Sequence, residues 1–303
     1  MNLTVNEIYK SFGEKNVLKG ISLSAQSGKA LGILGRNGAG KTTLIRIIMQ
    51  VFGADAGAVL LDGKPLNPEI VKIGYLPEER GLYPKQKIMN QLLYFAELKG
   101  IDKKTAKMTA EKYLAELQME QYNNARLDTL SKGNQQKIQL IASLISNPDI
   151  VILDEPFSGL DPVNAGMLKN VVKELIKDGK MVLFSSHQMN YIEEFCDDII
   201  ILNGGRAVLS GSIKRIKRSY ARNIIEILTE HNEKALSVFE SACPSFVKNA
   251  EILDGKLTVT LFDENKKSDL IKFVADNIPD VDGINVKEPT LAEIFIHYTE
   301  GSV

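Results

Sequence analysis

The sequence has little of what marks several specialised classes of protein. It contains two cysteines, Cys196 and Cys243, which are far apart and lack the spacing of metal ligands. We therefore expect free thiols in a reducing cytosol rather than a disulfide framework or a cysteine metal site. The net charge of −1 gives no global sign of a nucleic-acid partner, although it leaves room for local basic patches.

Long hydrophobic runs are missing as well. The longest apolar stretches, VILDEP, MVLFSS and DDIIILN, have the length of strands and fall far short of the roughly 20 residues that span a bilayer. The first residues, MNLTVNEIYKSFG, lack the basic and apolar regions of a signal peptide. We therefore expect a chain that is soluble by itself and that reaches a membrane through a partner.

The sequence does contain a regular succession of strand and helix patterns. Residues 1–30 alternate between apolar and polar, which predicts antiparallel strands with one solvated face. Beyond residue 30, short apolar runs alternate with helical patterns, and residues 87–117 have helical periodicity throughout. Short apolar runs separated by helices are typical of a buried parallel sheet, so we predict an α/β fold with a parallel core sheet.

A basic stretch, GSIKRIKRSYARN at 211–223, marks a change in composition. It is typical of a solvated linker, and contact with anionic lipid headgroups is the alternative. The 303 residues suit two domains, and we predict domains 1–215 and 216–303. The order of strand and helix patterns in the second domain predicts a small ferredoxin-like α+β fold.

The strongest motif is GRNGAGKTT, which follows the apolar run ALGILG and precedes a helical pattern. It matches G-x-x-x-x-G-K-[ST], in which backbone N–H groups and a helix N-terminus hold phosphates. The lysine bridges the terminal phosphates, and the hydroxyl that follows is offered to Mg²⁺. The predicted nucleotide-binding residues are Gly35, Arg36, Asn37, Gly38, Ala39, Gly40, Lys41, Thr42 and Thr43, with Lys41 also catalytic and Thr42 also a metal ligand.

The second motif is VILDEP at 151–156, an apolar strand that ends in two carboxylates. Ligands of open α/β sheets bind at the carboxyl ends of the strands. We predict that Asp154 holds Mg²⁺ through its water shell and that Glu155 orients or deprotonates the attacking water. Such a pair is also an ordinary loop start, and the phosphate-binding motif upstream favours the catalytic interpretation.

A third stretch, LDTLSKGNQQK at 127–137, has two interpretations. It can be a surface loop and a helix start in which Ser131 is the N-cap. It can also be a phosphate-binding turn that has lost some of its glycines. The stretch alone does not decide between the two.

Together with FSGLD at 157–161 and SSH at 185–187, these motifs resemble the nucleotide-binding subunit of ABC transporters over residues 1–215. The resemblance implies a P-loop NTPase cassette, in which an antiparallel β subdomain and a helical subdomain accompany the core sheet. It also implies that LSKGN is the family signature, usually L-S-G-G-Q, with Ser131 and Gly133 kept and Lys132 and Asn134 altered. In the family this turn caps the γ-phosphate bound to the opposite chain, and Lys132 points either toward that phosphate or to solvent.

The resemblance implies roles for further residues. Phe12 resembles the aromatic residue that stacks on adenine, with Tyr9 as its rival and a place in the core as the alternative. Glu78 in GYLPE stands where the family has a glutamine that reaches Mg²⁺, and a carboxylate there adds negative charge near the phosphates. Asp161 belongs to the D-loop that touches the opposing subunit, and it is also a good helix N-cap. His187 resembles the switch histidine that donates a hydrogen bond to the γ-phosphate.

The function implied by the resemblance is ATP hydrolysis, with ATP and Mg²⁺ bound, that powers a separate membrane permease. The expected partners are that permease and a second ATP-binding subunit, with the chain cytoplasmic and peripheral on the inner face of the cell membrane. The C-terminal stretch EPTLAEIFIHYTEG resembles the ending of subunits that serve export permeases. The alternatives are a P-loop kinase or GTPase and a soluble ABC ATPase of translation or DNA repair, which a single cassette without sustained heptads disfavours.

Overall fold

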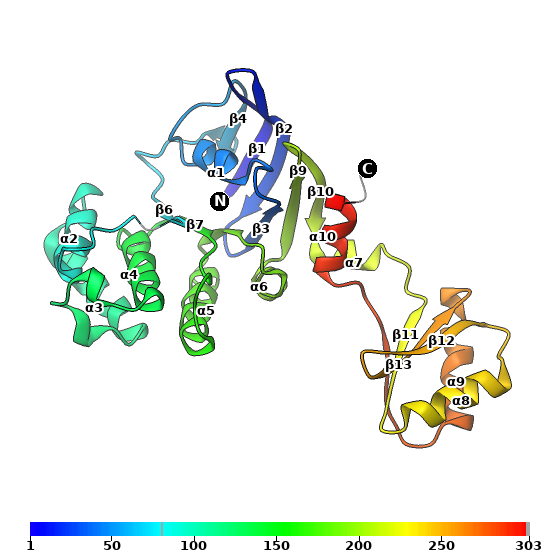
Figure 1. Ribbon diagram of the computed structural model, residues 1–303. Coiled ribbons are helices and arrows are strands. Elements are labelled where there is room, and N and C mark those ends of the chain that lie inside the picture. The colour runs from blue at the N-terminus through cyan, green and yellow to red at the C-terminus, as the bar shows by residue number, and fades with distance from the viewer. Residues whose placement is uncertain (80, 301–303) are drawn as a thin grey trace. The chain divides into compact units, whose positions relative to one another are not determined.

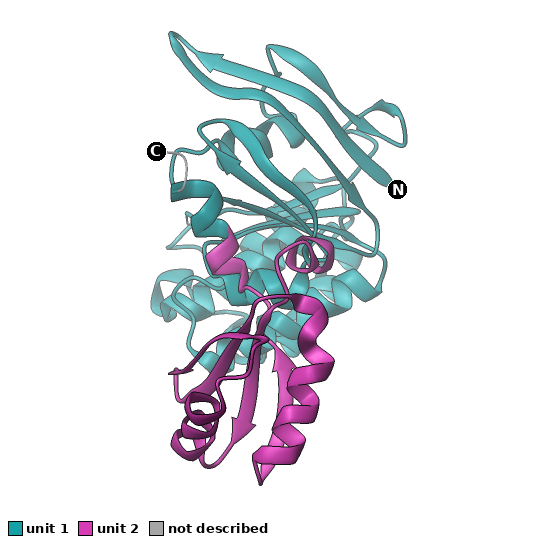
Figure 2. Ribbon diagram, turned by 90° about the vertical axis from the view of Figure 1, so that its right-hand side faces the viewer, with its two compact units in different colours: residues 1–213, 295–303 teal, residues 214–294 magenta. Residues whose placement is uncertain are grey.

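The computed structural model describes residues 1–79 and 81–300. The chain forms two compact units, one of residues 1–213 with the segment from Phe295 on, and one of residues 214–294 (Figure 2). This division differs from the predicted domains 1–215 and 216–303, because the end of the chain returns to the first unit. A hydrogen bond from the side-chain amide of Asn203 to the carbonyl of Tyr298 (3.3 Å) holds the returning segment there.

The first unit begins with an antiparallel sheet in the order β2-β1-β4-β5. From Ile21 onward, every second side chain of β2 is buried and the neighbours face outward, as a sheet with one covered face requires. The antiparallel strands predicted for residues 1–30 are thus confirmed. The strands of this sheet are β1 (Asn2–Phe12), β2 (Lys15–Gln26), β4 (Ala56–Leu61) and β5 (Lys64–Pro65).

The core sheet of the first unit has the order β10-β9-β3-β8-β7-β6. All neighbours from β9 to β6 pair in parallel, and β10 pairs with β9 in the antiparallel sense. Because β3, β7 and β8 are parallel neighbours, their last residues Gly35, Asp154 and Ser185 lie at one edge of the sheet. The strands are β3 (Ala30–Gly35), β6 (Ile73–Leu76), β7 (Ile150–Asp154), β8 (Met181–Ser185), β9 (Asp198–Asn203) and β10 (Arg206–Ser212).

Helices connect these strands (Figure 1). The helix that follows β3 buries Leu44, Ile45 and Ile48 in a hydrophobic cluster shared by both sheets of the unit. Helices α2, α3 and α4 contact one another and form the predicted helical subdomain. The bounds are α1 (Lys41–Ile48), α2 (Ile88–Leu98), α3 (Lys103–Glu116), α4 (Lys132–Leu144), α5 (Pro162–Lys177) and α6 (Met189–Phe195), with 3-10 turns at Glu120–Tyr122 and Leu127–Thr129.

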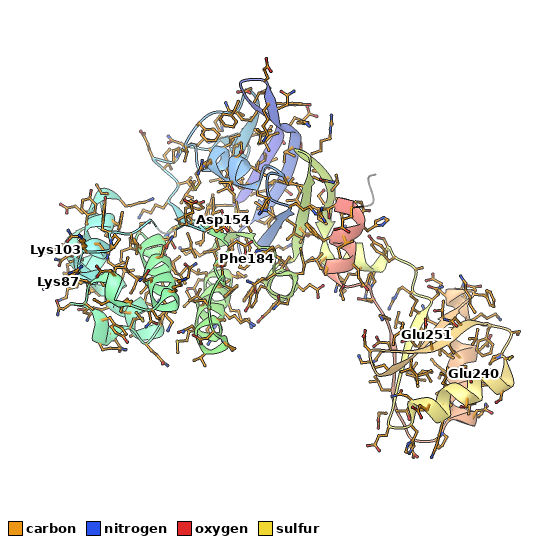
Figure 3. All side chains as sticks on the ribbon, in the orientation of Figure 1. Lys87, Lys103, Asp154, Phe184, Glu240 and Glu251 are labelled. Carbon is orange, nitrogen blue, oxygen red and sulfur yellow. The ribbon has the colours of Figure 1, made fainter. Side chains whose placement is uncertain are left out.

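Aromatic packing anchors the chain just beyond the carboxyl end of β7. The fully buried ring of Phe184 on β8 lies 5.8 Å from the ring of Phe157 and 5.8 Å from that of Phe195 on α6. Figure 3 shows Phe184 and Asp154 in the interior of the first unit. Since Phe157 is three residues from Asp154 in the chain, this packing restrains the segment that carries both carboxylates.

The second unit is built on an antiparallel sheet in the order β12-β13-β11-β14. Its elements follow one another as strand, helix, strand, strand, helix, strand, which confirms the predicted ferredoxin-like arrangement. Ile227, Leu257 and Val259 of the sheet pack with Phe239 and Leu270 of the helices. The bounds are β11 (Ile224–Thr229), α8 (Asn232–Ala242), β12 (Val247–Leu253), β13 (Lys256–Leu261), α9 (Lys267–Asn277) and β14 (Val281–Val286), with a 3-10 turn at Glu264–Lys266 and with α7 (Ile213–Arg218) before and α10 (Leu291–Glu300) after them.

Within residues 1–79 and 81–300, no helix is both long enough and apolar enough to cross a membrane.

Candidate functional site

The carboxyl edge of the core sheet opens onto a cavity of about 820 Å³. It is lined by the turn after β3, by the ends of β7 and β8, and by residues of β2 and α10. The cavity brings together most of the residues predicted from the sequence. These are Gly35, Arg36, Asn37, Gly38, Gly40, Lys41, Thr42, Thr43, Glu78, Asp154, Glu155 and His187.

The turn from Gly35 to Lys41 has the backbone that the phosphate-binding motif requires. Gly40 is the N-cap of α1 and has a positive φ of 107°. A Cβ atom at this position would lie 2.5 Å from Cδ2 of Leu18, so any other residue would have to displace the Leu18 side chain in addition to straining the backbone. Ala39 is buried beneath the turn and does not line the cavity. Lys41, Thr42 and Thr43, the first residues of α1, line the cavity, and the N–H groups at a helix start are suited to binding an anion.

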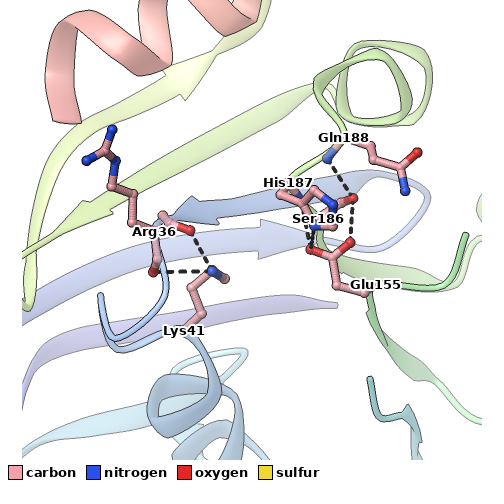
Figure 4. Close-up of polar contacts among 7 residues, drawn as sticks. Arg36, Lys41, Glu155, Ser186, His187 and Gln188 are labelled. Carbon is pink, nitrogen blue, oxygen red and sulfur yellow. Dashed lines mark hydrogen bonds and ion pairs between the residues drawn. The ribbon is translucent and has the colours of Figure 1, made fainter. Parts of the chain in front are cut away.

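Lys41 lies where a phosphate-binding lysine is needed. Its ammonium group donates to the carbonyl oxygen of Gly35 at 2.5 Å and contacts that of Arg36 at 3.5 Å (Figure 4). Both acceptors belong to the turn itself, so the amine is folded back over the loop. A charge-assisted bond to a phosphate oxygen is stronger than one to a neutral carbonyl, so the amine is placed to exchange these partners for a phosphate.

Asp154 ends β7 with its carboxylate almost completely buried (5% exposed). This burial raises the pKa of the Asp154 carboxyl above its ordinary value, and the negative charges of Glu78 and Glu155 act in the same direction. The hydroxyl of Tyr75 lies 3.5 Å from Oδ2 of Asp154. Burial, together with the Asp154 charge, raises the pKa of Tyr75 to about 12, so this hydroxyl stays protonated as a donor. The ionised form of Asp154 is therefore disfavoured in this cavity, and a nearby cation would stabilise it.

Glu155 is held at the cavity wall by the segment after β8. Its Oε2 accepts a hydrogen bond from Oγ of Ser186 (3.0 Å), and its Oε1 accepts from the backbone N–H of His187 (2.7 Å). Nδ1 of His187 lies 2.8 Å from the same Oε1 (Figure 4). The Glu155 backbone has a positive φ of 50°, a conformation that non-glycine residues adopt infrequently. These contacts fix the direction of the carboxylate, while the His187 side chain remains 71% exposed.

Other predicted site residues lie outside the cavity lining. Ser131 is the N-cap of α4, and its hydroxyl accepts a hydrogen bond from the N–H of Asn134 at 3.3 Å. Asp161 is the N-cap of α5 and accepts from the N–H groups of Val163 and Asn164. A Cβ atom at Gly133 would lie 3.4 Å from the side-chain amide nitrogen of Asn164, so the two helix starts pack together. The helix-cap interpretations of both residues therefore hold.

Phe12, the predicted adenine-stacking residue, also lies outside the lining. Its ring is 51% exposed and packs edge to face on Phe52 at 5.6 Å, with the Lys10 ammonium 5.5 Å from its centre. Its rival Tyr9 is 45% exposed and does not line the cavity either. The role of Phe12 stays a prediction.

Sequence reasoning missed several residues of the site. Ser186, which donates a hydrogen bond to Glu155, is part of the SSH motif, and its position next to His187 is the sequence signal that indicates it. Lys15 and Val17 line the cavity from β2, and Phe295 lines it from α10. No sequence signal links Phe295 to a turn about 250 residues before it, since only the returning end of the chain brings them together.

Comparison with known proteins identifies the family. The chain matches the family model described as ABC transporter over residues 18–158. It also matches the model described as ATP-binding protein DrrA1-3-like, C-terminal domain, over residues 211–299. A Bacillus subtilis protein described as uncharacterized ABC transporter ATP-binding protein YhaQ is 38% identical over 295 residues, which is 97% of this chain and 97% of that one. The chain is an ABC transporter ATP-binding subunit.

Two further proteins extend the comparison. The linearmycin resistance ATP-binding protein LnrL of Bacillus subtilis is 29% identical to this ABC subunit over 305 residues, 98% of each chain. A solved structure described as the ATP-binding subunit of an ABC transporter superposes with a TM-score of 0.67 at 28% identity, over 72% of this chain and 93% of that one. The predicted ABC cassette and its ATPase activity are thus confirmed, and the competing kinase or GTPase interpretation is excluded.

The donors in the cavity of this ABC subunit fit the Mg²⁺ predicted to accompany ATP. Mg²⁺ is held by one or two carboxylates together with waters and substrate phosphates rather than by an all-protein cage. No group of three His, Cys, Asp or Glu side chains that could hold a metal occurs among the described residues. The available oxygen donors are the buried carboxylate of Asp154, the carboxylate of Glu78 and the hydroxyl of Thr42.

Proposed function

We propose that two ABC subunits of this kind enclose two ATP molecules, each between the phosphate-binding turn of one chain and the LSKGN turn of the other. The observation that carries the proposal is the division of the chain's phosphate-binding features. The residues from Gly35 to Thr43, apart from Ala39, share a cavity with Glu155 and His187, whereas Ser131 lies outside it at the start of another helix. A helix N-terminus with a hydroxyl N-cap binds anions, and a second chain supplies the anion in this arrangement. The partner is an identical chain or a related one.

Within the chain, each side chain has a definite task in hydrolysis. Lys41 leaves the carbonyls of the loop and contacts the β- and γ-phosphates. Glu155, aimed by Ser186 and His187, accepts a hydrogen bond from the attacking water and orients it toward phosphorus. The exposed ring of His187 donates to the γ-phosphate. Phosphoryl transfer of this kind depends on positioning and on stabilisation of charge rather than on covalent chemistry.

We propose that Thr42, Asp154 and Glu78 hold Mg²⁺ beside the phosphates. The bound ion neutralises charge on the β- and γ-phosphates. The same positive charge would also offset the negative charge of the buried Asp154 carboxylate. Glu78 replaces the usual amide with a carboxylate, so this subunit brings one more negative charge to the site and depends more strongly on the cation.

The permease is proposed to dock on the surface that joins the core sheet to the helical subdomain. A cavity of about 390 Å³ lies there, with Tyr75 and Pro77 on one side and Phe95 of α2 and Ala142 of α4 on the others. Glu78 follows Pro77 directly in the chain, so a displacement of Pro77 by the docked permease would also move Glu78 in the nucleotide cavity. The chain is then cytoplasmic and peripheral on the inner face of the membrane, held there by the permease.

We propose export as the direction of transport. The support is the DrrA1-3-like C-terminal domain and full-length similarity to LnrL, whose description names resistance to linearmycin. ATP binding closes the pair of subunits, hydrolysis opens it, and the permease converts this motion into passage of its substrate.

Replacing Glu155 with Gln tests the proposal. The amide keeps the volume but does not take a proton from water, so we expect loss of turnover, retained ATP binding and a dimer trapped by ATP. ATPase assays and size-exclusion chromatography with Mg²⁺ and ATP measure both effects. Glu174→Gln on the exposed face of α5 is the matched control and leaves both unchanged. Retained turnover in Glu155→Gln removes this residue from its proposed role.

A further inference from the structure

Glu78 lies on a loop that has left the core sheet. Strand β6 ends at Leu76, and Pro77, Glu78 and Glu79 follow it outside any strand. Backbone carbonyls that leave a sheet need other donors, and Pro77 has no N–H with which to continue the ladder. The position of the Glu78 carboxylate in the nucleotide cavity therefore depends on what holds the peptide groups beside it.

The side chain that holds these groups is Gln139, near the middle of α4. It is 5% exposed, and its Nε2 donates to the carbonyl oxygens of Pro77 at 3.2 Å and of Glu79 at 2.9 Å. Both partners are acceptors, so the nitrogen of the amide is the end that faces them. One buried amide thus spans Glu78 by bonding to the residue on each side of it.

Helix α4 makes a similar contact with the other wall of the nucleotide cavity. Gln136, three residues before Gln139, donates from Nε2 to the carbonyl oxygen of Pro156 at 3.3 Å. Pro156 follows Glu155 directly, and Glu155 and Glu78 both line the cavity. The helix that begins at the LSKGN turn is therefore joined by side-chain amides to both segments that carry these carboxylates.

The charge of Glu78 explains why its loop needs to be held. Burial raises the pKa of the Asp154 carboxyl most strongly, and the negative charge of Glu78 adds to this rise. The two carboxylates therefore repel each other. Glu78 is exposed, so a movement of its loop toward solvent would relieve the repulsion. The two hydrogen bonds from Gln139 oppose this movement.

We propose that Gln139 is a positioning residue of the nucleotide site, which keeps the Glu78 carboxylate within reach of Mg²⁺ by fixing the peptide groups on both sides of it. The proposal deepens the function above and rests on the role given there to Glu78. Residues that orient a metal ligand commonly contribute about tenfold or more to metal affinity. Because Gln139 belongs to α4, it also ties Glu78 of one site to the LSKGN turn that serves the other.

Calorimetric titration with ATP, with and without Mg²⁺, tests the proposal in the Glu155→Gln background, in which ATP is not consumed. Gln139→Leu keeps most of the side-chain volume and removes both donors. We expect this variant to bind ATP as tightly as its parent without Mg²⁺ and to lose about tenfold of the affinity gained with Mg²⁺. In the chain with Glu155 intact, the Mg²⁺ concentration that gives half-maximal hydrolysis should rise by a similar factor.

A double-mutant cycle distinguishes positioning from general loosening of the fold. If Gln139 acts through Glu78, the two substitutions are not additive. Glu78→Ala alone should lower the gain from Mg²⁺, and adding Gln139→Leu should lower it no further. Gln91→Leu is the matched control, because Gln91 is 2% exposed on α2 and bonds to the backbone of Tyr83 and Gln86 instead. It should lower the melting temperature and leave the gain from Mg²⁺ unchanged.

The outcomes separate this proposal from the function on which it rests. An unchanged gain from Mg²⁺ in Gln139→Leu, a full further loss in the Glu78→Ala background, or an equal loss in Gln91→Leu would each overturn the positioning role. An unchanged gain in Glu78→Ala alone would contradict the role of Glu78 at Mg²⁺ and, with it, this proposal. Absence of ATP binding in the unsubstituted chain would contradict the ATPase function itself.

Discussion

The turns that precede α1 and α4 are both suited to binding an anion, but their surroundings differ. Both end in a helix N-terminus with unpaired N–H groups, and both contain glycine and a lysine. The turn at Gly35 to Lys41 is surrounded by side chains of its own chain, Asp154, Glu155 and His187 among them. The LSKGN turn lies outside that cavity, with Ser131 and Lys132 exposed.

In the proposed mechanism the two turns are half-sites that one chain does not combine. The first turn would bind phosphate, and the cavity around it contains the groups proposed for hydrolysis except the cap on the far side of the γ-phosphate. The second turn could provide such a cap, but it lies outside the nucleotide cavity of its own chain. In the proposed two-fold symmetric pair, each first turn would meet the other chain's second turn, and both sites would be completed at once.

The largest effect is expected from breaking the first turn. Lys41→Ala removes the charge that meets the terminal phosphates, so ATPase activity should fall by at least about a hundredfold. ATP binding to the isolated chain should weaken as well, because this turn does not need a partner to hold phosphate. Steady-state hydrolysis and calorimetry measure the two effects, with Lys177→Ala on exposed α5 as the control. Unchanged ATP binding in Lys41→Ala would falsify the assignment of the first turn.

Breaking the second turn should separate binding from hydrolysis. Ser131→Arg places a long cationic side chain in the cap, which blocks the site that this turn completes on the opposite chain while leaving the cavity of the same chain intact. We expect the isolated chain to bind ATP normally and to hydrolyse none. In a Glu155→Gln background, the added Ser131→Arg change should also abolish the dimer that ATP traps, as seen by size-exclusion chromatography. Normal hydrolysis by Ser131→Arg would return LSKGN to a simple helix start.

Mixing the two inactive variants sharpens the comparison further. If the pair consists of identical chains, a mixed pair joins the intact first turn of Ser131→Arg to the intact second turn of Lys41→Ala. Random mixing of equal amounts gives mixed pairs in half of all dimers, each with one complete site of two, so about a quarter of normal activity is expected to return. Activity is measured after co-incubation, with each variant alone as the control. A mixture as inactive as its components contradicts a composite site between identical chains.

Much of the fold and the site could be predicted because local sequence determines them. GRNGAGKTT requires a particular backbone, and Gly40 in it has a positive φ that favours glycine, so the motif predicts its own turn. The apolar runs of β3, β7 and β8 likewise indicate buried parallel strands, which bring Gly35 and Asp154 to one edge. In each case the residues that decide the structure are neighbours in the chain.

What the sequence did not predict depends on contacts between distant segments. The place of Phe295 follows from Glu300 meeting Arg36 and from Tyr298 meeting Asn203, and neither pair shares a pattern that is visible in the sequence. The predicted boundary at 215/216 rested on composition, which does not show that the end of the chain returns. The ring of Phe12 packs edge to face on Phe52, a contact that the sequence did not indicate, and its stacking on adenine stays a prediction.

A smaller effect separates the structural and phosphate-binding roles of Ser131. Aspartate is as good an N-cap as serine, so Ser131→Asp should keep the free energy of unfolding, whereas Ser131→Ala should lower it by about 1 kcal/mol. Aspartate also repels phosphate, so Ser131→Asp should lose more ATPase activity than Ser131→Ala despite its greater stability. Denaturant unfolding and hydrolysis assays provide the two values. If activity followed stability in the two variants, Ser131 would act as a helix cap alone.

The smallest effect concerns Asp161, which caps the helix packed beside Gly133. Hydrogen bonds from Asn164, and from the backbone of Val163, hold the pKa of the Asp161 carboxyl below its ordinary value of 3.8. A lowered pKa in the folded state means that the charge stabilises the fold fully above pH 3.8 and that this gain is lost as the pH falls through the folded pKa. Asp161→Asn keeps an N-cap oxygen and removes the charge. Its melting temperature should therefore lie slightly below that of the parent chain at pH 7, and the difference should shrink as the pH falls below 3.8 and through the folded pKa of Asp161. A difference that persists unchanged in acid would show that shape rather than charge makes the cap.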